Sequence, residues 1–226
     1  MLTQKIVISP LPLGYVAVFL PVITFHLCYF ISLMEGHINF CVPYWADCVS
    51  VSRTGRHGSA YFIFKGGIIT TAVLLLLMWQ LTRFWLRGLG SSSNWSILCL
   101  SVVGSASLIL YTLALGHTGD TFYLLRRFGV VLFMFCSFIS QLVAGSALSK
   151  IEEFKTDGKK LLRFSTIMLA IAMFSLVLDG VLGGDYDRIE NAFEWWLIML
   201  LIVHLFMMIQ LWKKSQFVLV VANSRT

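Results

Sequence analysis

Charged residues are scarce in this sequence of 226 residues: Asp, Glu, Lys and Arg together make up 12%, whereas 58% of the residues are hydrophobic. The mean hydropathy of +0.83 exceeds what a soluble domain can bury. The sequence also lacks a C-x-x-C pair, an H-x-x-x-H array and any nucleic-acid-binding motif. These absences argue against a zinc site and a nucleic-acid partner. We therefore expect a membrane protein with no metal and no cofactor.

Six apolar segments are long enough to cross a bilayer, whose core of roughly 30 Å takes about 20 residues of helix. They cover residues 11–33, 60–82, 95–116, 128–149, 163–182 and 193–212. The polar stretches between them are too short to form a second domain. The sequence therefore predicts one all-α domain over residues 1–226, a polytopic six-transmembrane-helix bundle whose first segment is an anchor and not a cleaved signal peptide.

The basic residues are divided unevenly between the two sides of this bundle. Eleven of the seventeen fall on the side of the two termini, so the positive-inside rule places both termini in the cytosol. Eight of the eleven acidic residues fall on the opposite, extracytosolic side. We expect either a bacterial inner membrane or a eukaryotic endomembrane or plasma membrane.

The longest extracytosolic loop, residues 35–58, reads EGHINFCVPYWADCVSVSRTGRHG and is too polar to enter lipid. Cys41 and Cys48 lie in it with six residues between them, on the oxidising side of the membrane. A small disulfide between them would need the loop to fold back on itself. We expect two free thiols, with the disulfide as the alternative.

Two carboxylates begin the last apolar segment, in the sequence ENAFEWW at residues 190–196. Asp187 and Glu190 have the spacing of a capping box, which gives Glu190 a structural role. Glu194 lies one turn deeper and has no such role. A carboxylate at that depth is expected to face the bundle interior and to pair with a cation. The candidate cations are Lys65, Arg126 and Arg127.

Two short segments, PYWAD at residues 43–47 and NAFEW at residues 191–195, resemble the Frag/DRAM/Sfk family. That family comprises six-helix membrane proteins with a Pro-Tyr-x-Ser-Asp-like loop and an Ala-x-Glu-Trp or Phe-Glu-Trp helix start. The resemblance implies a lipid-related function, such as remodelling of GPI-anchor lipids, control of phospholipid asymmetry or modulation of autophagy. The signature positions it implies here are Pro43, Tyr44, Asp47, Glu194 and Trp195.

This chain departs from the family pattern in two places. The prolines and the glutamate that are common after the loop motif are missing after Asp47, and Arg126 or Arg127 replaces a histidine expected near the fourth helix. The altered cluster is more basic. It therefore favours a phosphate-bearing headgroup over a GPI-specific role.

Our leading hypothesis is a protein that binds or organises phospholipid through an extracytosolic charged cluster. Arginines would hold the phosphate, and carboxylates would orient the arginines. The cluster consists of Asp47, Arg53, His57, Asp120, Arg126, Arg127, Glu190 and Glu194. The expected partners are membrane phospholipids, and a membrane-protein partner or a second copy of the chain is left open.

Two other functions use the same part of the sequence. In a lipid-modifying enzyme acting on an ester or a phosphodiester, His57 or His117 would be the general base, and Asp47 or Asp120 would orient it. A transporter would need charges along a path to the membrane midplane, and only His26 and His204 lie deep in the predicted helices. We expect neutral interhelical contacts for these two histidines and rank transport last.

Overall fold

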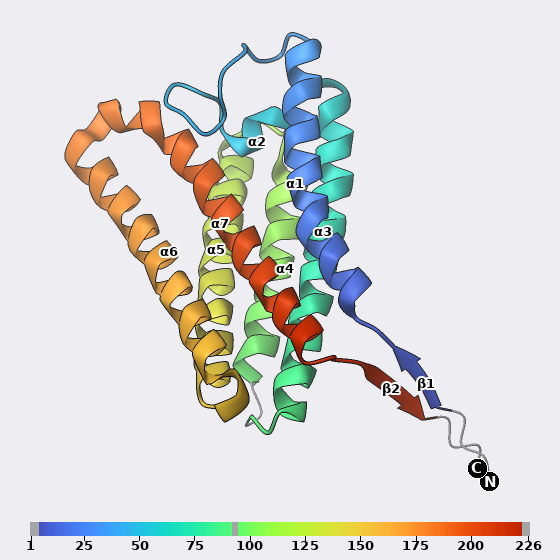
Figure 1. Cartoon of the computed structure of the whole chain (residues 1–226). Coiled ribbons are helices and arrows are strands. Elements are labelled where there is room, and N and C mark those ends of the chain that lie inside the picture. The colour runs from blue at the N-terminus through green and yellow to red at the C-terminus, as the bar shows by residue number, and fades with distance from the viewer. Residues whose placement is uncertain (1–4, 92–94, 223–226) are drawn as a thin grey trace.

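The computed structural model describes residues 5–91 and 95–222. In this part of the chain six helices have 20 residues or more: α1 Leu11–Met34, α3 Gly58–Gly88, α4 Trp95–Ala114, α5 Asp120–Ser149, α6 Lys155–Leu182 and α7 Asp187–Lys214. They pack together as a bundle (Figure 1). The short elements are α2 Val51–Thr54 and the 3-10 helices η1 Glu152–Phe154 and η2 Gly183–Tyr186.

Five described stretches are long and apolar enough to cross a membrane. Four of them are α1, α3, α4 and α5, and the fifth is the helical run Glu152–Lys214, which has 63 residues and contains both α6 and α7. These two helices run in opposite directions side by side and are joined by η2 (Figure 1). The prediction of an all-helical membrane protein is confirmed. Six separate spans, and the cytosolic placement of the termini, stay predictions.

Most of the helices extend beyond the apolar segments that predicted them. α5 begins at Asp120 and not at residue 128, so Arg126 and Arg127 lie well inside this helix. α7 begins at Asp187 directly after η2, and no side chain caps it, so the capping-box interpretation was wrong. The predicted bounds were too short because hydropathy detects only the residues that suit lipid, whereas a helix can continue into water.

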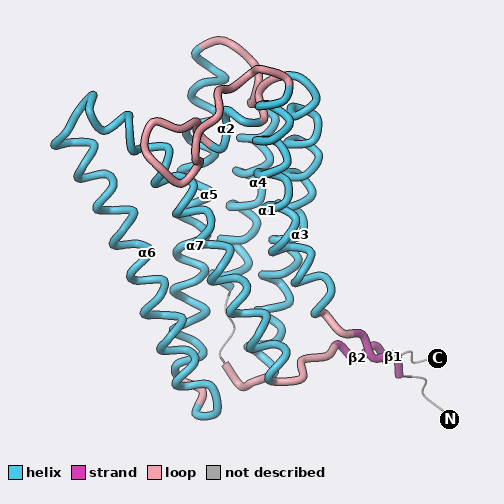
Figure 2. Tube along the Cα trace, turned by 45° about the horizontal axis from the view of Figure 1, so that its top comes forward, coloured by secondary structure: helices cyan, strands magenta, loops and turns pink. Residues whose placement is uncertain are grey.

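A two-stranded sheet, which the sequence did not predict, joins the two ends of the described chain. β1 Lys5–Ile8 pairs antiparallel with β2 Leu219–Ala222, with Lys5 opposite Ala222 and Ile8 opposite Leu219. Both strands project from one end of the bundle, which we call the sheet end (Figure 1). The opposite end, which we call the loop end, carries α2 and the loop of residues 35–50 (Figure 2).

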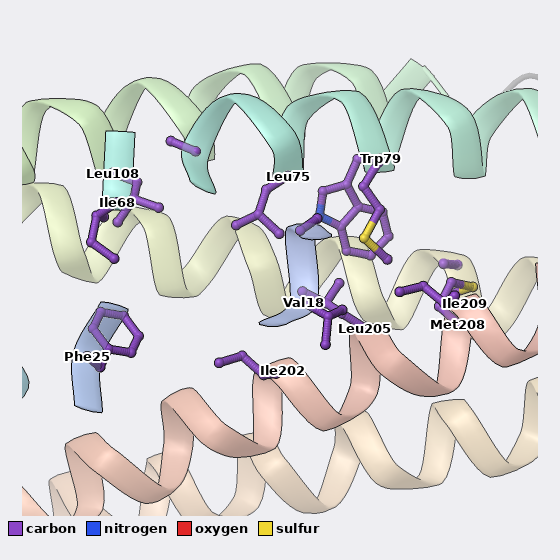
Figure 3. Close-up of a cluster of buried hydrophobic side chains, with 14 of the residues drawn as sticks. Val18, Phe25, Ile68, Leu75, Trp79, Leu108, Ile202, Leu205, Met208 and Ile209 are labelled. Carbon is purple, nitrogen blue, oxygen red and sulfur yellow. The ribbon is translucent and has the colours of Figure 1, made fainter. Parts of the chain in front are cut away.

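Buried apolar side chains from four helices fill the interior of the bundle. The cluster in Figure 3 contains Val18 and Phe25 of α1, Ile68, Leu75 and Trp79 of α3, Leu108 of α4, and Ile202, Leu205, Met208 and Ile209 of α7. Helices in lipid associate through close packing, which small residues permit. At Gly129 of α5, for example, an added Cβ would lie 2.9 Å from the Ser107 carbonyl oxygen and 2.8 Å from the Tyr111 Cβ.

Candidate functional site

The loop segment at residues 43–47 and the segment at residues 191–195 lie against each other at the loop end. Side chains near the start of α7 donate hydrogen bonds to loop carbonyls: Asn191 to Cys48 at 2.8 Å, Trp195 to Val49 at 2.9 Å and Trp196 to Tyr44 at 3.1 Å. The Trp195 side chain is fully buried, and its ring lies 5.6 Å from that of Tyr44. The two signature segments are therefore one docking contact, which holds the loop on α7.

An ion pair reinforces this contact. Asp47 accepts two hydrogen bonds from Arg188, one from Nε and one from Nη2, each 3.0 Å long, and the Asp47 amide donates to the Arg188 carbonyl at 2.7 Å. The Arg188 guanidinium lowers the pKa of the Asp47 carboxyl below its usual value. Asp47 is thus engaged by a residue outside the predicted cluster. Because both side chains are largely exposed, the pair positions the loop more than it stabilises the fold.

The loop is also closed on itself and tied to α1. Cys41 and Cys48 form a disulfide, so the free thiols that we expected there are paired. The Tyr29 hydroxyl donates to the Cys41 carbonyl at 2.5 Å. His26 lies 2.8 Å from the Val22 carbonyl oxygen through Nδ1 and 2.8 Å from the Tyr44 hydroxyl through Nε2. Since a carbonyl only accepts, Nδ1 carries the proton and donates to it, and in the neutral ring Nε2 accepts a hydrogen bond from the Tyr44 hydroxyl.

Glu194 lies beneath this docked loop. Its carboxylate is placed against the backbone N–H groups of Val51 and Ser52, the first two residues of α2, and its charge interacts with that of Arg56. It was expected to pair with Lys65, Arg126 or Arg127, and none of these forms an ion pair with it in the described part of the chain. Arg56, which the sequence did not single out, forms no ion pair with Glu194 among the described residues either, but it is the cation whose charge acts on the Glu194 carboxylate.

Arg56 is half-buried between α2 and α3. Its Nη2 donates to the Ser52 hydroxyl at 2.9 Å, and its Nε is buried without a hydrogen-bond partner among the described residues. Burial, together with the nearby charge of Arg126, lowers the pKa of Arg56 below its usual value. Tyr111 of α4 completes the group, because its hydroxyl lies beside Ser52 and both arginines. We call Arg56, Tyr111, Arg126 and Glu194 the polar cluster.

Arg126 enters the polar cluster from α5. Its Nη1 donates to the carbonyl oxygens of Ala114 at 3.1 Å and His117 at 2.7 Å, at the end of α4. These bonds satisfy carbonyls that the end of a helix leaves open. A guanidinium has five N–H donors, so Arg126 keeps others for a further partner.

An elongated cavity leads from the polar cluster into the bundle. Its lining comes from the loop-end residue Val51 and from α1, α3, α4, α5 and α7, and Glu194 and Tyr111 are both part of it. On α3 the lining extends from Phe64 to Trp79, fifteen positions or roughly 22 Å along the helix axis. Apolar side chains form most of the wall. The arrangement therefore offers a long apolar space that ends at a charged group.

The remaining predicted residues lie apart from the cavity. Arg53 and Asp47 line a depression in the loop, and His57 lies in an open outer pocket beside His37, with 5.5 Å between the two ring centroids. His117 stacks on Phe122. The exposed residues Asp120, Arg127 and Glu190 take no part in an ion pair in the described part of the chain. The eight predicted residues therefore do not form one cluster: only Glu194 lines the cavity, and Arg126 lies in the polar cluster at its end.

Sequence reasoning missed Arg56, Tyr111 and Arg188. Arg56 and Arg188 carried a weak signal, because they fall on the side predicted to be extracytosolic, where the positive-inside rule makes arginines less expected. Tyr111 carried none, since a tyrosine in an apolar segment suits a helix core equally well. Residues 5–91 and 95–222 contain no group of three His, Cys, Asp or Glu side chains that could hold a metal ion.

Comparison with known proteins identifies the family. The family model described as the Frag1/DRAM/Sfk1/Cwh43P N-terminal domain matches residues 10–212, which is most of the chain. No curated protein and no solved structure matches the chain. The resemblance carried by the two short segments is confirmed. This integral membrane protein belongs to the Frag1/DRAM/Sfk1/Cwh43P family.

Proposed function

We propose that the protein binds a membrane lipid with a phosphate-bearing headgroup. The phosphate lies beside Arg56 and Arg126 at the loop end, which faces away from the cytosol, and an acyl chain fills the cavity. The observation that carries the proposal is the position of Glu194 and Tyr111, which join the polar cluster to the apolar cavity. A polar group and a long apolar wall in one continuous site match the two parts of a lipid.

The charges of the polar cluster favour an anionic ligand. Arg56 and Arg126 carry two positive charges, and Glu194 carries one negative charge when ionised, so a positive charge is left over. The charges of the two arginines repel each other, and an anion between them would remove that cost. The buried Nε of Arg56 has no partner among the described residues and could donate to a phosphate oxygen.

Lipid retention by matched arginine variants tests this proposal. The protein is purified in mild detergent, and native mass spectrometry then measures phosphatidate binding to the wild type, Arg56→Gln and Arg53→Gln. Arg53 is exposed and lies in α2, three positions before Arg56, so it controls for the loss of a positive charge. We expect Arg56→Gln to weaken binding about tenfold or more, because a charge-assisted hydrogen bond is lost. Arg53→Gln should bind as the wild type does.

Glu194 provides a second test of the same site. Its charge acts on Arg56 and would hold that side chain in the site, so Glu194→Gln should weaken lipid co-purification without preventing membrane insertion. Glu190→Gln is the matched control, because Glu190 is an exposed carboxylate on the same helix. Unchanged bound lipid in Glu194→Gln, or equal losses in Arg56→Gln and Arg53→Gln, would contradict the proposal.

One contact favours a lipid-modifying enzyme as the second candidate. His37 Nε2 lies 3.3 Å from a Glu35 carboxylate oxygen, and His57 is adjacent, which is an arrangement that a general base could use. The pairs expected from the sequence are less suitable, because Asp47 is engaged by Arg188 and His117 stacks on Phe122. Phospholipid turnover in proteoliposomes that is lost in His37→Ala and His57→Ala would favour the enzyme over a binding protein.

A further inference from the structure

The wall of the cavity also contains polar side chains deep inside the bundle. Gln141 of α5 lines the cavity and is 1% exposed. Its Nε2 donates to the Leu201 carbonyl of α7 at 3.4 Å, whereas its Oε1 is buried and has no hydrogen-bond partner among the described residues. Because the Leu201 carbonyl can only accept, the amide nitrogen must face it, and the acceptor Oε1 is left over.

Serines of α4 and α5 also line the cavity. Ser105 of α4 and Ser137 and Ser140 of α5 line the cavity together with Gln141. Other serines of these helices, such as Ser107, donate to a carbonyl of their own helix, as hydroxyl groups in lipid usually do. No such bond is found for Ser105, Ser137 and Ser140 in the part of the chain that the structure describes, whereas Ser101, which also lines the cavity, donates to the Leu98 carbonyl. The hydroxyl groups of Ser105, Ser137 and Ser140 therefore add hydrogen-bonding capacity that the helices do not use.

A buried acceptor without a partner is costly in an apolar wall. An acyl chain alone would leave this cost in place. A ligand that presents a hydroxyl group at this depth would remove it, and the serines could accept or donate further bonds. The position is defined along α7, because Leu201 follows Glu194 by seven positions, or roughly 10 Å of helix axis.

We propose that the cavity is selective for a lipid whose chain carries a hydroxyl group near its middle, which donates to Gln141 Oε1. This inference rests on the proposed function, since the phosphate at the polar cluster sets the depth at which the hydroxyl group lies. The polar cluster alone would select lipids with a phosphate-bearing headgroup. Gln141 would restrict this class further, to lipids whose chain carries a hydroxyl group.

Two lipids that differ by one hydroxyl group test the inference. Lysophosphatidate with a stearoyl chain is compared with lysophosphatidate whose stearoyl chain is hydroxylated near the middle, by native mass spectrometry of the full-length protein in detergent. We expect the wild type to bind the hydroxylated lipid about tenfold more tightly, which is the effect of one satisfied buried acceptor. Gln141→Leu should lose this preference and should bind the plain lipid at least as tightly as the wild type does.

Gln210→Leu is the matched control, because Gln210 bonds Tyr15 and lines no part of the described cavity, so it should keep the preference. Gln141→Met replaces Gln141→Leu if the leucine variant fails to fold. Equal binding of the two lipids by the wild type would overturn the inference, because a water molecule would then be the partner of Gln141. The proposed function would still stand in that case. A preference that survives in Gln141→Leu would also overturn it. Failure of both lipids to bind would overturn the proposed function and the inference together.

Discussion

The His26 ring and the Tyr44 hydroxyl lie 2.8 Å apart, which joins α1 to the loop segment at residues 43–47. The same tyrosine accepts a hydrogen bond at its carbonyl from Trp196 and packs its ring against Trp195. Tyr44 therefore connects α1 and α7 through the loop. The two short segments that mark the family therefore hold α1, the loop and α7 together above the cavity.

Removal of the Tyr44 hydroxyl should weaken this connection between α1 and the loop. Tyr44→Phe leaves His26 Nε2 without its partner in a half-buried place, so the free energy of unfolding should fall by about 1 to 2 kcal/mol. Thermal or denaturant unfolding in detergent measures the change. Tyr123→Phe, at an exposed tyrosine of α5, should have no comparable effect. Equal losses in the two variants would show that the His26 contact contributes nothing.

The disulfide should stabilise the loop and protect its two cysteines. Alkylation without reductant should leave Cys41 and Cys48 unlabelled, and alkylation after reduction should label both, as mass spectrometry of peptides would show. Cys41→Ser combined with Cys48→Ser should lower the free energy of unfolding by about 2 kcal/mol, from the entropy of closing a short loop. Cys99→Ser is the control. Rapid labelling of Cys41 in unreduced protein would refute the pairing.

The ion pair of Asp47 and Arg188 should make stability depend on acid pH. Because Arg188 lowers the pKa of folded Asp47, its contribution is present above the ordinary aspartate pKa of about 3.9 and is lost as the pH falls through the lowered value. The melting temperatures of wild type and Asp47→Asn should therefore differ slightly at neutral pH and converge in acid. Asp120→Asn should show no such convergence. A constant gap between wild type and Asp47→Asn at every pH would contradict this.

The close approach of α4 and α5 at Gly129 should not tolerate a side chain. A Cβ there would meet the Ser107 carbonyl and the Tyr111 Cβ at less than 3.0 Å, so Gly129→Ala should cost about 1 to 3 kcal/mol of stability. Gly66→Ala on α3 is the control, because a Cβ there meets no atom within 4 Å. If both variants unfold at the same temperature, the helices are not held together at this point.

Hydropathy located the helices because lipid admits only segments that satisfy their own backbone bonds. It could not locate the helix ends: residues 120–127 are polar enough for a loop, yet they form the first two turns of α5. That error also hid the difference between Arg126 and Arg127. Neighbouring residues in a helix point in different directions, so Arg126 reaches the end of α4 while Arg127 is exposed.

Glu194 could be recognised from the sequence because a carboxylate inside an apolar segment is costly and calls for a reason. Its partner could not be recognised in the same way. Arg56 is brought beside it by the path of the loop, which depends on a disulfide, on backbone contacts and on the ion pair with Arg188. None of these is visible in the local pattern of residues 50–57.

The structure of the purified protein with its bound lipid resolved tests the central claim most directly. The account predicts a phosphate within hydrogen-bonding distance of Arg56 and Arg126, and an acyl chain that runs from Glu194 between α1, α3, α4, α5 and α7. Lipid found only on the outer surface of the bundle, with no chain in the cavity and no phosphate at Arg56, would contradict it.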